Sequence, residues 1–416
     1  MPLHIPPSLH HRSFRLLWIG QAISVAGSQM QIWALLWHVR LLTDQPIALG
    51  GIGLARILPV ILFSLLGGAV ADSANRRRVL FVTQTVMAFV ALVLAWLTFK
   101  GQITLWQIYA LTAIQAMAVA FDLPARQALI PNLVPAKDLS NAFSMQSIAL
   151  QVGSIIGPAL SGLVIAYWGQ YYTYLINAVS FLAVIVALLL IGSIPQRTRG
   201  SGRIQIKYVD IIEGVRFILK QPVILSSMML DFFATFFSSA NTLMPIFARD
   251  ILKVGAVEYG WLSAAQSIGA MAAASIISQL REIKRQGRTL LISVIAFGFA
   301  TILFGVSRSF NLAMIALVII GASDSVSAII RNTIRQLQTP DYIRGRMTSI
   351  NQIFFLGGPQ LGEVEAGLVA QLLGAPIAVI TGGIGCLLAV GWIAQRWPQL
   401  RNYNGDEPIE AGAMAD

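Results

Sequence analysis

Charged residues are scarce in this chain. Asp, Glu, Lys and Arg make up 11% of its 416 residues, whereas hydrophobic residues make up 56%. Because soluble domains carry about 25% charged residues, the composition excludes an ordinary soluble protein. The single cysteine, Cys386, lies in an apolar run. A disulfide framework and a cysteine metal site are therefore excluded, and we expect no bound metal.

Groups that could perform catalysis are also scarce. Three of the four histidines lie within the first eleven residues, and no GxxxxGK[ST] phosphate loop is present. The sequence therefore predicts neither an enzyme nor direct drive by ATP. The net charge of +11 is compatible with a nucleic-acid partner. However, the basic residues lie between apolar runs rather than on a soluble face with interleaved aromatics, so we expect no nucleic-acid partner.

Apolar runs of about 20 residues recur along the whole chain, and each is long enough to cross the hydrocarbon core of a bilayer. They predict an all-α integral membrane protein with twelve transmembrane helices. The expected spans are 16–39, 50–71, 79–99, 105–125, 141–166, 171–192, 223–247, 257–280, 289–307, 310–330, 347–373 and 375–395.

The basic residues lie mainly in loops on one side of these spans. The opposite loops hold only Arg40, Lys100, Arg249, Lys253 and Arg308 of the 29 Lys and Arg residues. Since basic loops resist translocation, both termini are predicted to be cytoplasmic. The expected segments are a cytoplasmic start (1–15), a six-helix bundle (16–192), a basic linker (193–222), a second six-helix bundle (223–395) and a cytoplasmic tail (396–416). Within the linker, apolar spacing over Tyr208 to Leu219 predicts a helix on the inner membrane surface.

The loop GGAVADSANRRRVL joins spans two and three. Gly68 predicts a close helix contact, Asp72 the end of a helix, and Asn75 a left-handed turn residue. The next helix is expected to begin at Arg76, Arg77 and Arg78. This spacing resembles the loop signature of the major facilitator superfamily, although Ser73 and Asn75 stand where a basic residue and Gly are usual.

The second half of the chain repeats features of the first. A shift of 210 residues places Asp72 on Glu282 and Arg78 on Arg288. A shift of 205 places Gly153, Gly157, Gly162 and Gly169 on Gly358, Gly362, Gly367 and Gly374. Transporters are commonly built from such repeats. The resemblance to the major facilitator superfamily therefore covers nearly the whole chain, and it implies two pseudo-symmetric bundles.

Four predicted spans carry polar residues at helical spacing, whereas spans three, six, nine and twelve are nearly all apolar. These stripes, on spans one, four, seven and ten, are Gln21, Ser24, Ser28 and Gln31; Thr112, Gln115, Asp122 and Arg126; Ser227, Asp231, Thr235, Ser238 and Thr242; and Asp324, Ser327, Arg331 and Arg335. In the superfamily these four spans line the central cavity, so the resemblance implies a substrate cavity. The alternative is that the small hydroxyls bond helices together.

Span five contains Gly153, Gly157, Pro158 and Gly162. The glycines predict a flat face for close helix contact, and Pro158 permits a bend. This pattern resembles the superfamily's antiporter signature, with Ser161 replacing one Gly; a generic packing face is the alternative. The stretches FRLLWIGQAISVAGSQM and GPQLGEVEAGLVA resemble the drug/proton antiporter branch that includes enterobactin exporters and macrolide efflux pumps.

Charges inside spans are costly, so we expect them to be paired or functional. Asp122 and Arg126 are one turn apart and predict a local ion pair. Asp324 and Arg331, seven positions apart on one helix face, predict a second pair. Asp231 has no basic residue three or four positions away, so it is predicted to be unpaired and to carry the coupling proton. Glu363 is the next candidate for this role.

Two gates are predicted. We expect Asp72 and the arginines Arg76 to Arg78 to hold the inner side shut, helped by Glu282 and Arg288. On the outer side, Arg56 is expected to pair with Glu363 rather than Glu365, because the two glutamates point to different helix faces. The alternative for Arg56 is that it extends outward to the membrane surface.

Together these patterns predict a multi-pass protein of the bacterial inner membrane. The expected function is proton-coupled export of an amphipathic organic molecule, such as a siderophore or drug, by a monomer that uses no cofactor beyond the proton gradient. Import, lysophospholipid transport, and a transport-silent receptor or scramblase on the same fold are the alternatives.

Overall fold

The computed structural model describes residues 6–192, 215–237, 240–279, 283–340 and 343–405. Within these ranges the regular structure is helical throughout and no strand occurs. Helices satisfy all their backbone hydrogen bonds internally, as hydrocarbon surroundings require. The first half contains η1 (Pro7–His10), α1 (Arg12–Leu42), α2 (Ile47–Ser73), α3 (Arg76–Phe99), α4 (Leu105–Leu129), η2 (Ile130–Asn132), η3 (Ala136–Asp138), α5 (Leu139–Tyr167) and α6 (Gln170–Ile191). The second half contains α8 (Pro222–Phe237), α9 (Ala240–Ile246), η4 (Phe247–Ile251), α10 (Ala256–Ile277), α11 (Gln286–Val306), α12 (Phe310–Gln338), α13 (Arg344–Leu373), α14 (Ala375–Arg396) and α15 (Pro398–Asn402).

Every predicted span falls on a helix, with two differences. Span seven, described on both sides of residues 238–239 as α8 and α9, ends in a π-helical turn at η4, and α12 continues through Gln338 instead of ending at residue 330. Arg331 and Arg335 therefore lie inside a helix and not in a loop. Ten helices of the described ranges are long and apolar enough to cross a membrane. The other two long helices, α1 and α13, have 31 and 30 residues and are more polar.

Contacts divide the chain into two compact units. Unit 1 comprises Met1–Asp44, Ala55–Ile204 and Gly255–Ala264, and unit 2 comprises Gln45–Leu54, Gln205–Val254 and Ala265–Asp416. The first turns of α2 thus belong to unit 2, and the first turns of α10 belong to unit 1. The predicted linker helix lies mostly outside the described residues, but residues 215–220 are helical, and Phe217 and Ile218 pack against Ile224, Met228, Ile343 and Met347.

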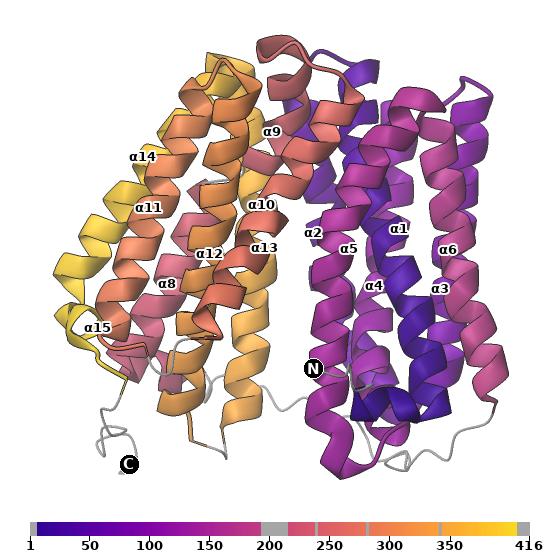
Figure 1. Ribbon diagram of the computed structural model, residues 1–416, viewed down its shortest axis with the longest axis horizontal. Helices are drawn as coiled ribbons and strands as arrows, with labels where there is room; N and C mark the ends of the chain where they lie inside the picture. Colours follow the sequence, from indigo (N-terminus) through magenta and orange to yellow (C-terminus); the bar gives the residue numbers. More distant parts are fainter. Residues whose placement is uncertain (1–5, 193–214, 238–239, 280–282, 341–342, 406–416) are drawn as a thin grey trace. The chain divides into compact units, whose positions relative to one another are not determined.

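The internal repeat is visible in the packing of each unit. In unit 1, α1 packs against α5 and α6, and α3 packs against α4 and α6. In unit 2, α8 packs against α13 and α14, and α11 packs against α12 and α14, which is the same pattern six spans later (Figure 1). Gly169 and Gly374, paired by the repeat, precede α6 and α14 with φ angles of 91° and 90°. The predicted all-α fold of two repeated bundles is confirmed.

The loop between α2 and α3 corrects two predictions. Asn75 is extended, with φ −67° and ψ 107°, and its Oδ1 accepts a hydrogen bond from the Arg78 backbone N–H at 3.2 Å. It is an N-cap and not a left-handed residue, because an Asn side chain can satisfy a free N–H of the first helical turn. The close helix contact belongs to Gly67: a Cβ there would lie 2.1 Å from the Ala120 carbonyl of α4, whereas a Cβ on Gly68 would meet no atom within 4 Å.

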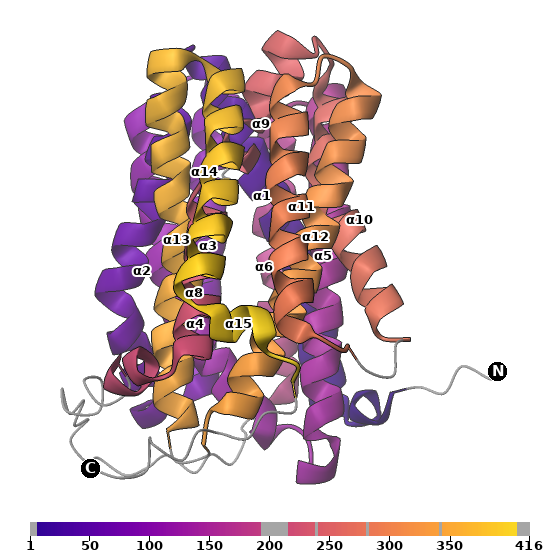
Figure 2. The ribbon, with the colours of Figure 1, turned by 90° about the vertical axis from the view of Figure 1, so that its left-hand side faces the viewer.

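The corresponding start of α11 is capped from the far end of the chain. Its N-cap, Arg285, is left-handed (φ 55°) and gives no side-chain cap. Instead, the backbone N–H of Gly287 donates to the Tyr403 carbonyl, just after α15, at 2.9 Å. Leu400 of α15 is fully buried, and Figure 2 shows α15 turned off the end of α14 toward α11. The carboxyl-terminal segment thus completes the amino end of α11.

This contact leaves no room for a side chain at position 287. A Cβ on Gly287 would lie 1.6 Å from the Leu400 carbonyl oxygen. We expect Gly287→Ala to cost about 1–3 kcal/mol of stability and to lower the Tm of the detergent-purified protein. The matched control is Gly391→Ala in α14, where a Cβ would meet nothing within 4 Å and the helix gains propensity. Equal Tm values for the two variants would contradict the role of this contact.

Candidate functional site

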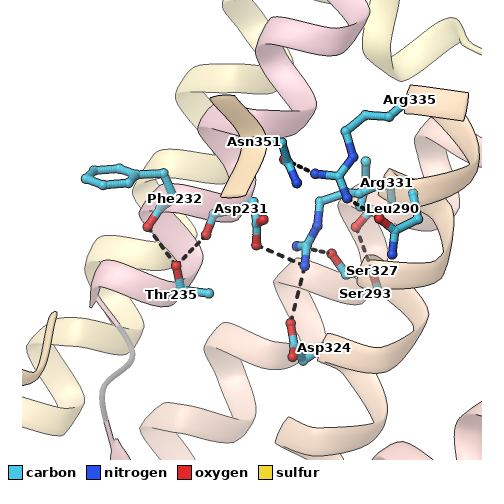
Figure 3. A network of polar contacts seen from close by, with 11 residues as sticks. Asp231, Phe232, Thr235, Leu290, Ser293, Asp324, Ser327, Arg331, Arg335 and Asn351 are labelled. Carbon is cyan, nitrogen blue, oxygen red and sulfur yellow. Dashed lines mark hydrogen bonds and ion pairs between the residues drawn. The ribbon is translucent and has the colours of Figure 1, made fainter. Parts of the chain in front are cut away.

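The most buried opposite charges of unit 2 face each other between α8 and α12. The Arg331 Nη2 lies 2.9 Å from the Asp231 Oδ1, and the two side chains are only 4% and 5% exposed (Figure 3). The prediction that Asp231 is unpaired is therefore wrong. Its partner lies 100 positions later in the chain, beyond the reach of any local pattern. Removing either partner would leave an uncompensated buried charge.

Arg331 contacts a second carboxylate on its own helix. Its Nη1 donates to the Ser327 hydroxyl at 2.7 Å. Because Ser327 lies one turn earlier on α12, this bond holds the guanidinium group back along its own helix. Its Nη2 lies 3.5 Å from the Asp324 Oδ1, so the predicted pair is present but long. Asp324 is 51% exposed, in contrast to Asp231. One guanidinium nitrogen is thus shared by a buried acid and an exposed one.

Further polar contacts join α13 to this group. Arg335 donates to Asn351 of α13 and to Asn332 of α12 (Figure 3). The Thr235 hydroxyl donates to the Asp231 carbonyl at 2.8 Å, so it bonds its own helix. Two acids and two arginines balance each other in charge. We refer to Asp231, Asp324, Ser327, Arg331 and Arg335 as the α8–α12 charge cluster.

Unit 1 holds a related charged group, in which one acid and one arginine of the same helix pair with each other. Asp122 of α4 pairs with Arg126, as predicted, and also accepts hydrogen bonds from Thr83 at 2.9 Å and Gln84 at 2.8 Å, both on α3. The repeat places Arg126 on Arg331 and Asp122 on Ser327. An arginine therefore occurs at this position in both units. Its buried acidic partner lies on the same helix in unit 1 (Asp122) and on α8 in unit 2 (Asp231).

The polar stripe of α1 is buried inside unit 1. Gln31 donates to Gln115 of α4 at 2.6 Å and accepts from Asn177 of α6 at 2.6 Å, which forms a chain of amides across three helices. Gln21, Ser24 and Thr112 are also buried, and Ser28 is half-buried. The amide chain joins three helices of unit 1, and both the cavity role of the stripe and its helix-bonding alternative stay predictions. Sequence patterns missed Asn177 because span six is otherwise apolar.

In the second half, Thr242 is buried, and Ser238 lies outside the described residues. Thr235 packs against α13, because a Cβ on Gly358 would lie 2.5 Å from its hydroxyl oxygen. The repeat gives the matching contact in unit 1, where a Cβ on Gly153 would lie 2.6 Å from a methyl group of Val25 on α1. Glycines at equivalent positions thus let α5 and α13 approach the first helix of their own unit.

The glycines of the antiporter signature contact two helices. Gly157 faces α1, where a Cβ would meet Gln29 at 2.5 Å, and Gly162 faces α10, where a Cβ would lie 2.4 Å from the Ala256 carbonyl. In unit 2, Gly367 faces Gly50 of α2, whose Cα would lie 3.0 Å from a Cβ on Gly367. The predicted close contacts of span five are present.

The predicted gate residues have the following surroundings. Arg76 donates to Asn132 at 2.9 Å and Arg77 to the Leu188 carbonyl at 2.7 Å, both within unit 1. Arg288 is exposed. The Asp72 side chain and Glu282 lie outside the described residues. The carboxylate of Glu363 lies against α2, 2.7 Å from where a Cβ of Gly53 would stand, and Glu365 is half-buried. Arg56 belongs to the other unit, so its pairing stays a prediction, as does the inner gate.

Nothing in the described ranges brings three His, Cys, Asp or Glu side chains together in a way that could hold a metal ion. The charge cluster is held together by ion pairs and hydrogen bonds.

Solved membrane transporters share this fold. A bacterial homologue of the human lysosomal transporter Spinster, inward-facing and unoccupied, gives a TM-score of 0.71 at 14% identity over 96% of this chain and 97% of that one. A POT family transporter in complex with 5-aminolevulinic acid gives a TM-score of 0.72 at 14% identity over 96% and 98%. At such identity the likeness shows the fold alone, which is that of the major facilitator superfamily.

Sequence comparison places the chain within that superfamily. Residues 6–411 match the family described as "Transmembrane secretion effector", and the chain belongs to this family. It is 25% identical over 393 residues to the multidrug efflux pump Tap of Mycolicibacterium fortuitum, covering 91% of this chain and 94% of Tap. It is 23% identical over 401 residues to the enterobactin exporter EntS of Shigella boydii, covering 96% and 95%. The protein is therefore a multi-pass inner-membrane transporter and not an enzyme.

The buried ion pair makes a stability prediction. Arg331→Gln leaves Asp231 buried without its counter-charge, which we expect to cost about 3–5 kcal/mol and to lower the Tm strongly. The double variant Asp231→Asn/Arg331→Gln removes both charges and should recover most of that loss. Asp44→Asn, which breaks the exposed pair with Arg40, is the control and should cost no more than about 1 kcal/mol. A double variant no more stable than Arg331→Gln would refute the pairing.

Proposed function

We propose that this protein is a proton-coupled exporter of an amphipathic organic small molecule, working as a monomer by alternating access. Support for export comes from its family and from its relatives, which are named as a multidrug efflux pump and an enterobactin exporter. Support for coupling comes from the buried carboxyl of Asp231. A drug or a siderophore is the expected substrate, and the proton gradient is the expected energy source.

The observation that carries this proposal is the buried Asp231–Arg331 pair, with its 2.9 Å contact. An arginine keeps its proton at all physiological pH values, so Asp231 is the member of the pair that can change charge. When Asp231 takes up a proton, the pair loses its charge attraction and Arg331 needs another partner. Asp324, already 3.5 Å from the same nitrogen, supplies one. Protonation is thereby converted into a movement of Arg331 between α8 and the middle of α12.

This arrangement makes the strength of the Asp231–Arg331 pair depend on whether Asp231 is protonated. A protonated Asp231 weakens the tie between α8 and α12, and a deprotonated Asp231 restores it. The proton acts here as a ligand of Asp231. A ligand shifts a conformational equilibrium by its difference in affinity for the two states. If α8 and α12 separate in one state, the proton gradient therefore biases the equilibrium between the two states.

The test is transport in proteoliposomes with an imposed pH gradient, using ethidium and enterobactin as separate probes. We expect Asp231→Asn/Arg331→Gln to abolish proton-driven accumulation while downhill exchange continues, because the double variant stays folded but has no titratable group in the pair. Asp44→Asn should transport as the unaltered protein does.

If the double variant still concentrates a probe against its gradient, Asp231 does not carry the proton, and Glu363 becomes the residue to replace next. If the unaltered protein moves both probes only down their gradients, at every imposed pH difference, proton-coupled export of these compounds is refuted.

A further inference from the structure

A groove with a volume of about 340 Å³ lies between α3 and α4 of unit 1. It is lined by Thr85, Val86, Phe89 and Val90 of α3 and by Leu111 and Ile114 of α4. The Thr85 hydroxyl is the one hydrogen-bond donor that these six side chains carry, and it donates to the Phe81 carbonyl of its own helix at 2.7 Å. The groove therefore fits an apolar occupant.

The groove lies at the depth that the acyl chains of one leaflet reach. Thr85 and Phe89 follow Arg78, in the first turn of α3, by seven and eleven residues. At 1.5 Å per residue these intervals correspond to about 10 and 16 Å. The hydrocarbon core of a bilayer is about 30 Å thick, so each leaflet fills about 15 Å of it. A lipid whose headgroup lies at Arg78 can therefore place an acyl chain in the groove.

The start of α3 offers a cation to such a headgroup. Arg76 donates to Asn132 at 2.9 Å and Arg77 donates to the Leu188 carbonyl at 2.7 Å, so both side chains are bound within unit 1. The side chain of Arg78, in contrast, is exposed. Of the three arginines, Arg78 is thus the one that can meet a ligand from outside the helix bundle.

Arg78 and the groove lie on one face of α3. Val82, Thr85 and Phe89 follow Arg78 at intervals of four, three and four residues, and all four residues are exposed. These intervals place their side chains in a single stripe along the helix. The stripe has a cation at one end and apolar surface along the rest of its length. An anionic phospholipid has the complementary distribution, with a charged phosphate above an apolar chain.

The internal repeat contains the same stripe. The shift of 210 residues places its four members on the first half of α11, at Arg288, Ile292, Ile295 and Phe299, and these four residues are exposed as well. Phe89 and Phe299 are 66% and 60% exposed. Each half thus carries an arginine, two β-branched residues and a phenylalanine at the same spacing on an exposed face. This recurrence indicates one kind of contact with the surrounding membrane.

We infer that Arg78 and the α3–α4 groove bind one anionic glycerophospholipid, with its phosphate on the Arg78 guanidinium and one acyl chain in the groove. Because basic helix ends stay on the cytoplasmic side, this lipid belongs to the cytoplasmic leaflet. A zwitterionic lipid fits less well, since its headgroup amine balances the phosphate charge. The site is separate from the charge cluster and does not depend on which molecule is transported.

The experiment is native mass spectrometry of the purified full-length protein, titrated separately with dioleoyl phosphatidylglycerol and dioleoyl phosphatidylcholine. Arg288→Gln is present throughout, so that a lipid on the equivalent stripe of α11 does not enter the measurement. We expect this parent to prefer phosphatidylglycerol. Adding Arg78→Gln should lower the affinity for phosphatidylglycerol about fivefold and leave that for phosphatidylcholine unchanged, because one attraction between a basic residue and an anionic lipid is lost.

The matched control is Lys137→Gln, which removes the same charge from an exposed position on η3, outside the stripe. It should keep the parent's preference for phosphatidylglycerol. An equal loss of preference in Lys137→Gln and Arg78→Gln would indicate general attraction to a basic surface and would overturn the site.

A second variant tests the groove itself. Ile114→Trp fills it from α4, at a position that is 40% exposed and can accept a larger side chain. It should weaken binding of both lipids and keep the ratio of their affinities, whereas Ile114→Val should bind both as the parent does. Tm values check that each variant is folded.

Three results would overturn the inference. An unchanged ratio of the two affinities in Arg78→Gln is expected if Arg78 serves only the predicted inner gate. Unchanged affinities in Ile114→Trp would show that no acyl chain occupies the groove. Conversion of a dimer into a monomer by Ile114→Trp, visible in the same spectra, would assign the groove to a second copy of this chain.

Discussion

A charge buried among apolar helices must find its counter-charge inside the protein, since neither lipid nor distant water can stabilise it. Both units meet this requirement around an arginine at equivalent places in the repeat. In unit 1, Arg126 finds its acid on its own helix, and two α3 side chains complete the coordination of Asp122. In unit 2, the position of that acid is taken by Ser327, and the arginine reaches across to Asp231 of α8. The ion pair of unit 1 lies within one helix, whereas the ion pair of unit 2 joins α8 to α12.

The same repeat governs how closely the helices approach. Glycines at matching positions of α5 and α13 allow backbone contact with the first helix of each unit and with the early turns of α10 and α2. The contact of Gly162 with Gly260 in unit 1 corresponds to that of Gly367 with Gly50 in unit 2. The Gly162–Gly260 and Gly367–Gly50 contacts are backbone on backbone, so a side chain at either position would push the two helices apart.

Sequence patterns were sufficient for the helices, the repeat and the local Asp122–Arg126 pair, because these depend on spacing within one or two helical turns or on an alignment of the two halves. They failed where the deciding contact joins distant parts of the chain. Asp231 was read as unpaired because Arg331 is 100 residues away. Asn177 was overlooked because a single amide does not interrupt an apolar run. Asn75 was expected to turn the chain by its backbone, whereas its side chain caps α3. Gly67, and not its neighbour Gly68, makes the helix contact because only one of two adjacent helical residues faces α4.

The capping of α11 by Tyr403 has a consequence for biosynthesis. Because the Gly287 N–H is satisfied by a carbonyl 116 residues later, the amino end of α11 cannot be completed until Tyr403 has been synthesised. In unit 1, by contrast, α3 is capped by Asn75, only three residues before the Arg78 N–H that it serves, so this helix start can form as soon as it has been synthesised. A chain that stops before Tyr403 carries an α11 whose first turn lacks this partner for the Gly287 N–H.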